Sequence, residues 1–157
     1  MTNTAWITRL LDCLAGRGDE VLAYAKQFHT GLSSDDALTY QKGKVAEEIG
    51  ELIQAMSARN YANGRSYPDV RGSVESEAAD VIIAAYVLVS LKYTEAPLVI
   101  PVSVEYLGAS ERADLLVSAL RRDDIDLVIS IAASILAHLR CDPASAVADR
   151  VDFNKTR

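Results

Sequence analysis

The chain has 157 residues, of which 50% are hydrophobic and 24% charged, and its formal net charge is −6. This length predicts a single domain over 1–157, and the composition excludes an intrinsically disordered chain. The acidic excess excludes a nucleic-acid partner, because such binding depends on Lys and Arg that neutralise phosphates. No basic leader and no apolar run of about 20 residues is visible, so we expect a cytoplasmic protein without a membrane segment.

Hydrophobic residues recur at helical spacing along most of the chain, which predicts an all-α helical bundle. Gly16-Arg17-Gly18 separates the first two expected helices, and 33–36 offers several cap candidates for the third. The stretch 60–72 is typical of a loop. The expected helices cover, in chain order, 5–15, 19–29, about 35–59, 74–92, 111–122, 124–140 and 143–154.

The clearest helix-start signals lie in the second half of the chain. Ser73 and Ser110 are the expected N-caps of the helices that follow them, and Asp142-Pro143 combines an N-cap acid with proline in the first turn. Hydrophobic residues recur at every second position over part of 98–106, which is typical of a short extended segment. Pro101 argues against a central strand there.

Two stretches, Val81–Leu91 and Ile125–Leu139, are apolar nearly all the way round a helical wheel. Such helices are buried on most sides, so we expect them to form a central pair. In so short a chain this favours a second subunit that covers part of the surface, in a homodimer or homotetramer. The alternative is a monomeric bundle with two deeply buried core helices.

Acidic residues accompany the core face of the expected third helix. One face of that helix is apolar and consists of Val45, Ile49, Leu52 and Met56. Glu48 lies at the edge of this face. Glu51 lies one turn further on and is a surface neighbour of Glu48. Glu47 lies nearer the far side.

The fourth helix repeats the three-residue spacing with Glu77 and Asp80, and here both acids lie on a face that is otherwise core. Buried ionised carboxylates are costly unless they are paired or bound to metal. Lys42, Lys44 and Lys92 flank these helices rather than line the same faces. We therefore expect a hard divalent cation, Mg²⁺ with Mn²⁺ as a substitute, which prefers oxygen ligands and substrate phosphates.

Other chemistries fit poorly. A di-iron bundle requires a glutamate three residues before each ligand histidine, and neither His29 nor His138 has one. Zinc clusters, a nucleophile elbow and a phosphate-binding P-loop are also missing from the sequence.

At these positions the chain resembles the MazG-like all-α NTP pyrophosphatase superfamily. Members carry Glu-x-x-Glu on one helix and Glu-x-x-Asp on the next, often with a further Glu ahead, and here Glu47, Glu48, Glu51, Glu77 and Asp80 match that pattern. Members also often carry Lys-x-x-x-Asn-x-x-Arg near the C-terminus. That pattern is matched by Arg150, Asn154 and Arg157, with Arg in place of Lys. The resemblance covers about 39–91 and the last helix.

The resemblance implies an Mg²⁺-dependent enzyme that hydrolyses a (d)NTP to the monophosphate and pyrophosphate, in nucleotide-pool housekeeping. Its metal ligands would be Glu48, Glu51, Glu77 and Asp80. Glu47 and Glu48 would be the catalytic residues, with Glu47 orienting or deprotonating the water or supporting the ligands from outside. The candidates for phosphate contacts are Lys44, Asn154, Lys155 and Arg157.

Several questions stay open at the level of sequence. The substrate could instead be a phosphoribosyl-ATP-type anhydride, or the chain could be a non-catalytic metal-binding helical interaction protein. The base pocket is unassigned, since aromatics on helices supply either a stacking surface or core. The aromatic candidates are Trp6, Tyr24, Phe28, Tyr40 and Tyr61.

Overall fold

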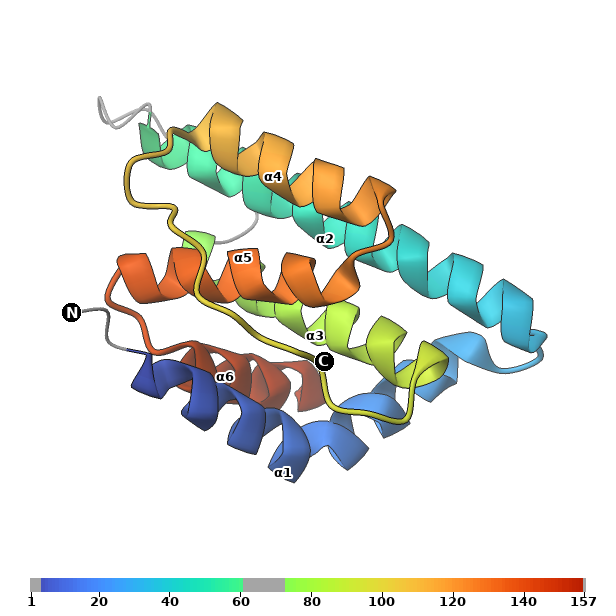
Figure 1. Ribbon diagram of the computed structural model, residues 1–157. Coiled ribbons are helices and arrows are strands. Elements are labelled where there is room, and N and C mark those ends of the chain that lie inside the picture. Colours follow the sequence, from blue (N-terminus) through green and yellow to red (C-terminus); the bar gives the residue numbers. More distant parts are fainter. Residues whose placement is uncertain (1–3, 61–72, 157) are drawn as a thin grey trace.

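The computed structural model describes residues 4–60 and 73–156, which form six helices and no strand. This confirms the predicted all-α bundle. The helices, in chain order (Figure 1), are α1 (Ala5–His29), α2 (Ser34–Asn60), α3 (Val74–Lys92), α4 (Ala109–Arg121), α5 (Ile125–His138) and α6 (Pro143–Lys155). Of the predicted loop over 60–72, Asn60 is instead the last residue of α2, and 61–72 lie outside the described residues.

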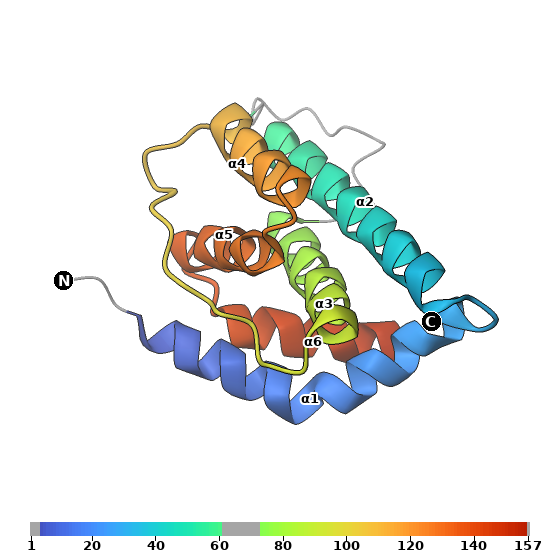
Figure 2. The same ribbon diagram turned by 45° about the vertical axis from the view of Figure 1, so that its right-hand side comes forward.

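The helices are stacked as three layers of two. Helices α2 and α4 form one outer layer, α3 and α5 the middle layer, and α1 and α6 the other outer layer (Figures 1 and 2). The apolar stretches around Val81–Leu91 and Ile125–Leu139 thus form the predicted central pair. In α5, ten of the fourteen residues are buried. Because the chain itself covers both helices, their burial does not require a second subunit, and the homo-oligomer stays a prediction.

Local side chains start most of the helices where the sequence predicts. Ser33 Oγ accepts from the amide of Asp36 at 3.1 Å, and Ser73 caps α3 in the same way. Asp124 and Asp142 cap α5 and α6. The start of α4 differs from the prediction, since Gly108 is its N-cap and no side chain caps it.

The glycines near residue 17 do not divide the first helix, contrary to the prediction. Helix α1 runs continuously through Gly16 and Gly18, with a bend near its middle (Figure 2). Gly18 is buried, and a Cβ there would lie 2.5 Å from Oη of Tyr86 on α3. Helix α1 approaches α3 so closely here that a side chain would not fit, which explains the glycine. The same packing offsets the low helix propensity of glycine.

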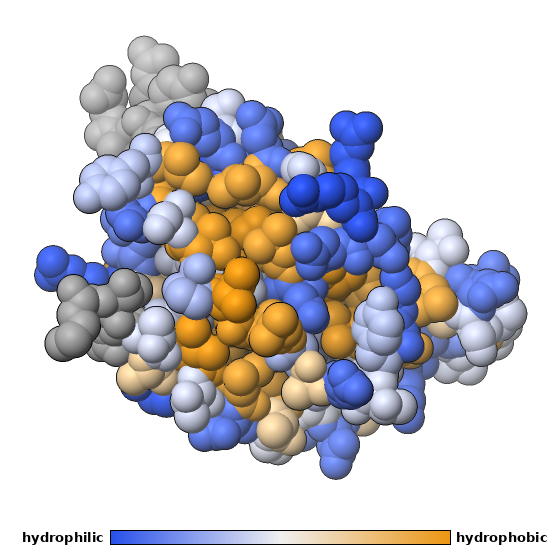
Figure 3. All heavy atoms as spheres, in the orientation of Figure 1, coloured by the Kyte–Doolittle hydropathy of each residue, from blue (hydrophilic) through white to orange (hydrophobic). Residues whose placement is uncertain are grey.

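An extended segment, 93–108, connects α3 to α4 across the outside of α5. Two serines of α5 hold it: Ser130 Oγ accepts from the amide of Ile100 at 3.0 Å, and Ser134 Oγ accepts from the amide of Val102 at 2.9 Å. These hydroxyls take the place of a partner strand. Figure 3 shows apolar residues gathered on the face that this segment crosses.

None of the described helices has a span long and apolar enough to cross a bilayer.

Candidate functional site

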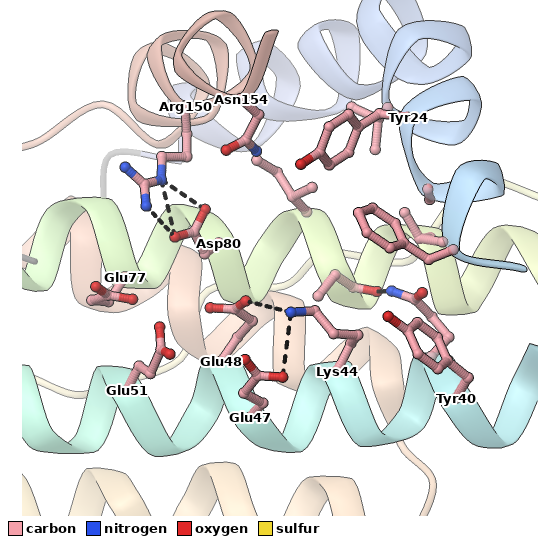
Figure 4. A pocket seen from close by; sticks show the side chains of 17 residues that line it. Tyr24, Tyr40, Lys44, Glu47, Glu48, Glu51, Glu77, Asp80, Arg150 and Asn154 are labelled. Carbon is pink, nitrogen blue, oxygen red and sulfur yellow. Dashed lines mark hydrogen bonds and ion pairs between the residues drawn. The ribbon is translucent and has the colours of Figure 1, made fainter. Parts of the chain in front are cut away.

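Helices α2 and α3 are antiparallel neighbours, and Glu48 and Glu51 of α2 face Glu77 of α3 (Figure 4). The apolar face of α2 that runs from Val45 to Met56 is buried as predicted, and this burial fixes how α2 is rotated about its own axis. It leaves Glu48 and Glu51 at the edge that faces α3, where Glu77 points back at them. One carboxylate oxygen from each of these three residues lies within 4.8 Å of the others.

Two of these carboxylates are buried without full compensation. The side chain of Glu77 is 3% exposed, and neither its Oε2 nor Oε2 of Glu48 has a hydrogen-bond partner. Burial, followed by the charge of Asp80, raises the pKa of each to about 7, from an ordinary value of 4.5. A buried anionic oxygen without a donor is costly, so this cluster favours a proton or a cation.

Asp80 lies in the same part of the molecule but is turned away from the other three acids. Its carboxylate accepts from Arg150 of α6, with Nε at 2.8 Å from Oδ1 and Nη2 at 2.8 Å from Oδ2 (Figure 4). The guanidinium also stacks on the ring of Phe153, 4.5 Å from its centre. The four predicted metal ligands are therefore neighbours, but only three of them converge.

A lysine on α2 occupies the other side of the cluster. Nζ of Lys44 lies 3.3 Å from Oε2 of Glu47 and 3.5 Å from Oε1 of Glu48. The side chain of Glu47 is 55% exposed, as its place on the helix predicts, whereas that of Glu48 is 14% exposed. Glu47 therefore lies at the rim of the site and Glu48 inside it.

The acids form one end of a pocket of about 340 Å³ between α1, α2, α3 and α6. Aromatic side chains line its other end: Tyr24 and Phe28 from α1, edge to face with ring centres 5.6 Å apart, and Tyr40 from α2. Tyr40 precedes Glu48 by eight residues, or about 12 Å along a helix axis. The pocket thus has an anionic end and an aromatic end.

A buried glutamine supports the aromatic end. Nε2 of Gln41 donates to the carbonyl of Ala84 at 2.9 Å, which leaves Oε1 to accept from Nε2 of His29 at 3.0 Å. The imidazole in turn packs edge to face on Tyr40. His29 does not line the pocket itself but contacts Gln41 and Tyr40, which do.

The candidates for phosphate contacts are divided by the structure. Lys44 and Asn154 line the pocket. Lys155 does not, because its Nζ binds Oε2 of Glu20 at 2.8 Å on the outside of α1. Its role as a phosphate contact stays a prediction that the lining of this pocket does not support. Arg157 lies outside the described residues.

Of the aromatic candidates, Tyr24, Phe28 and Tyr40 line the pocket, whereas Trp6 is buried in the core. Tyr61 lies outside the described residues. The pairing of Arg150 with Asp80 was not predicted from the sequence, although Arg150 belongs to the C-terminal pattern. The role of Gln41 was not predicted either, because no sequence pattern marks it.

Comparisons with protein-family models, with curated proteins and with solved structures found no match. The function is therefore argued from the site. Its donors are carboxylate oxygens only, two of them buried without a partner, and this donor set fits Mg²⁺ or Mn²⁺ rather than softer metals. Glu48, Glu51 and Glu77 would hold the ion.

Proposed function

We propose that this chain is an Mg²⁺-dependent nucleoside triphosphate pyrophosphohydrolase that converts a (d)NTP to the monophosphate and pyrophosphate. One observation carries the proposal: buried, partnerless carboxylate oxygens of Glu48 and Glu77 face a pocket whose opposite end is aromatic. A metal-bound polyphosphate suits the first end and a nucleobase suits the second. The distance of about 12 Å along α2 between the two ends matches an extended nucleotide.

The residues of the pocket have separable roles in this proposal. Divalent metal, when bound, supplies Lewis-acid stabilisation of the phosphates and an activated water. Glu48, Glu51 and Glu77 hold and orient the ion. Glu47, at the solvent rim, has the position of a group that orients or deprotonates the attacking water.

Cations and aromatics complete the proposed substrate site. Lys44, Arg150 and Asn154 place N–H donors along the pocket, as anionic phosphate oxygens require. Tyr40 and Phe28 are 39% and 50% exposed, so their rings are available for stacking on a base.

The resemblance to the MazG-like superfamily supports the same proposal. Its two acidic motifs fall on the facing sides of α2 and α3, and two of the three C-terminal motif residues, Arg150 and Asn154, line the pocket. Motifs separated by about 70 residues in sequence thus contribute to one cavity. The activity, the Mg²⁺ dependence, the homo-oligomer and the family membership are proposals on this basis.

A pyrophosphate-release screen tests the proposed activity directly. The panel contains all canonical dNTPs and NTPs and phosphoribosyl-ATP, each with Mg²⁺ and with EDTA. We expect release from at least one nucleoside triphosphate only with Mg²⁺, and a loss of at least 100-fold in Glu48→Gln. Glu95→Gln, the same change at an exposed position after α3, is the matched control.

Each alternative has its own outcome in this screen, combined with thermal melting of the protein with and without metal. Turnover of phosphoribosyl-ATP alone would reassign the substrate. Metal-dependent melting without any turnover would show a non-catalytic metal-binding protein. Turnover that survives Glu48→Gln would refute the assignment of the site.

A further inference from the structure

The four acidic side chains between α2 and α3 do not all point to the same place. Glu48, Glu51 and Glu77 point at one another between α2 and α3, whereas Asp80 points to α6 (Figure 4). Asp80 also stands one turn from Glu77 on the same helix, so its direction reflects the partner it binds rather than its place on α3.

That partner is held firmly. Arg150 engages both oxygens of Asp80, with Nε at 2.8 Å from Oδ1 and 3.0 Å from Oδ2 and Nη2 at 2.8 Å from Oδ2. The two side chains are 17% and 13% exposed, so water screens the pair weakly. Stacking on Phe153 keeps the guanidinium in position.

We propose that Arg150 is an internal cation that competes with a divalent metal ion for Asp80. The inference rests on the metal site of the proposed function and adds a regulatory element to it. A carboxylate that is gripped at both oxygens cannot swing toward Glu77 without breaking charge-assisted hydrogen bonds. A divalent ion that recruits Asp80 therefore has to displace Arg150.

Displacement of Arg150 from Asp80 would leave its guanidinium where it can bind an anion in the same pocket. A released guanidinium remains on α6 at the wall of the same pocket, beside Asn154. There its N–H donors are free for an anion. Metal binding and anion binding are then positively coupled through one side chain, and the coupling is reciprocal.

Isothermal titration of Mn²⁺ alone into the full chain tests the competition without any turnover. We expect Arg150→Gln to bind Mn²⁺ about tenfold more tightly than the wild type, equivalent to about 1.4 kcal/mol. Arg9→Gln is the control for loss of an arginine charge, because Arg9 also pairs with an aspartate, Asp142 at 3.0 Å, outside the pocket. That variant loses the same charge and should bind Mn²⁺ as the wild type does.

A double-mutant cycle separates competition for Asp80 from simple loss of a nearby charge. In an Asp80→Asn background, Arg150→Gln should change the Mn²⁺ affinity by less than about twofold, because the contested carboxylate is gone. An equal tightening in both backgrounds would overturn the inference. So would an Arg150→Gln variant that binds Mn²⁺ no better than Arg9→Gln.

The failure of this inference is distinguishable from failure of the proposed function. If Arg150→Gln fails to tighten Mn²⁺ binding while the wild type releases pyrophosphate, only the competition is refuted. If the wild type binds no Mn²⁺ at all, the metal site and the competition are refuted together. Far-ultraviolet circular dichroism of each variant confirms that the helices are intact.

Discussion

Replacing Glu77 with glutamine should stabilise the protein at high pH when metal is withheld. The side chain is buried, one oxygen has no donor, and burial followed by the charge of Asp80 raises the pKa of Glu77 from 4.5 to about 7. At about 1.4 kcal/mol for each pH unit, ionising Glu77 in the folded protein costs about 3 kcal/mol. Glutamine has the shape of the protonated acid and avoids this cost.

The effect has a defined pH window. Below pH 4.5 both the folded and the unfolded chain carry the proton, and Glu77 has no influence on stability. Between pH 4.5 and about 7 the unfolded chain releases the proton while the folded chain retains it, so the free energy of unfolding falls as pH rises. Above about pH 7 the full penalty is present in the wild type and absent in Glu77→Gln.

Urea unfolding, followed by circular dichroism in EDTA at pH 5 and pH 8, measures the difference. We expect Glu77→Gln to exceed the wild type by about 3 kcal/mol at pH 8 and by less than about 1 kcal/mol at pH 5. Glu95→Gln, at an exposed position, should follow the wild type at both values. A Glu77→Gln variant that gains equally at both pH values, or loses stability at pH 8, would refute the argument from burial.

Three further predictions concern packing, the extended segment and metal. Gly16→Ala should raise the free energy of unfolding by about 1 kcal/mol, because nothing lies within 4 Å of the added Cβ. Gly18→Ala should forfeit that gain through its clash with Oη of Tyr86, and adding Tyr86→Phe to Gly18→Ala should restore part of it, because the ring carbon Cζ stays 3.3 Å from the new Cβ; urea unfolding of these variants measures the differences. Ser134→Ala should cost about 1 kcal/mol and speed hydrogen exchange at Val102, whose amide loses its acceptor. Mg²⁺ at pH 8 should raise the melting temperature of the wild type, EDTA should reverse the rise, and an unchanged melting temperature would contradict the metal site.

Much of the fold is predictable because its determinants are local. Ser73, Asp124 and Asp142 cap the helices that immediately follow them, and the spacing of apolar residues reveals which helices are central. The same periodicity places Glu48 at the edge of a buried stripe and Glu77 within one. A carboxylate on a core face is a strong sequence signal, since only a compensating partner makes it tolerable.

What escapes prediction depends on contacts between distant parts of the chain. Gly18 reads as a helix break until Tyr86 is seen against it. The ion pair between Asp80 and Arg150 joins residues 70 positions apart, so no local pattern predicts it, and the role of Asp80 as a metal ligand stays a prediction. Lys155 follows Asn154 directly on α6, yet its ammonium pairs with Glu20 of α1 and it does not line the pocket that holds the acids.

The place of α6 in the chain bears on how the molecule is made. Helices α1 to α3 emerge early in synthesis, and they already carry Glu48, Glu77 and Asp80. Arg150 leaves the ribosome some 70 residues after Asp80, so Asp80 has to wait for its cationic partner until the last helix docks, whereas Lys44 accompanies Glu48 on α2 from the start.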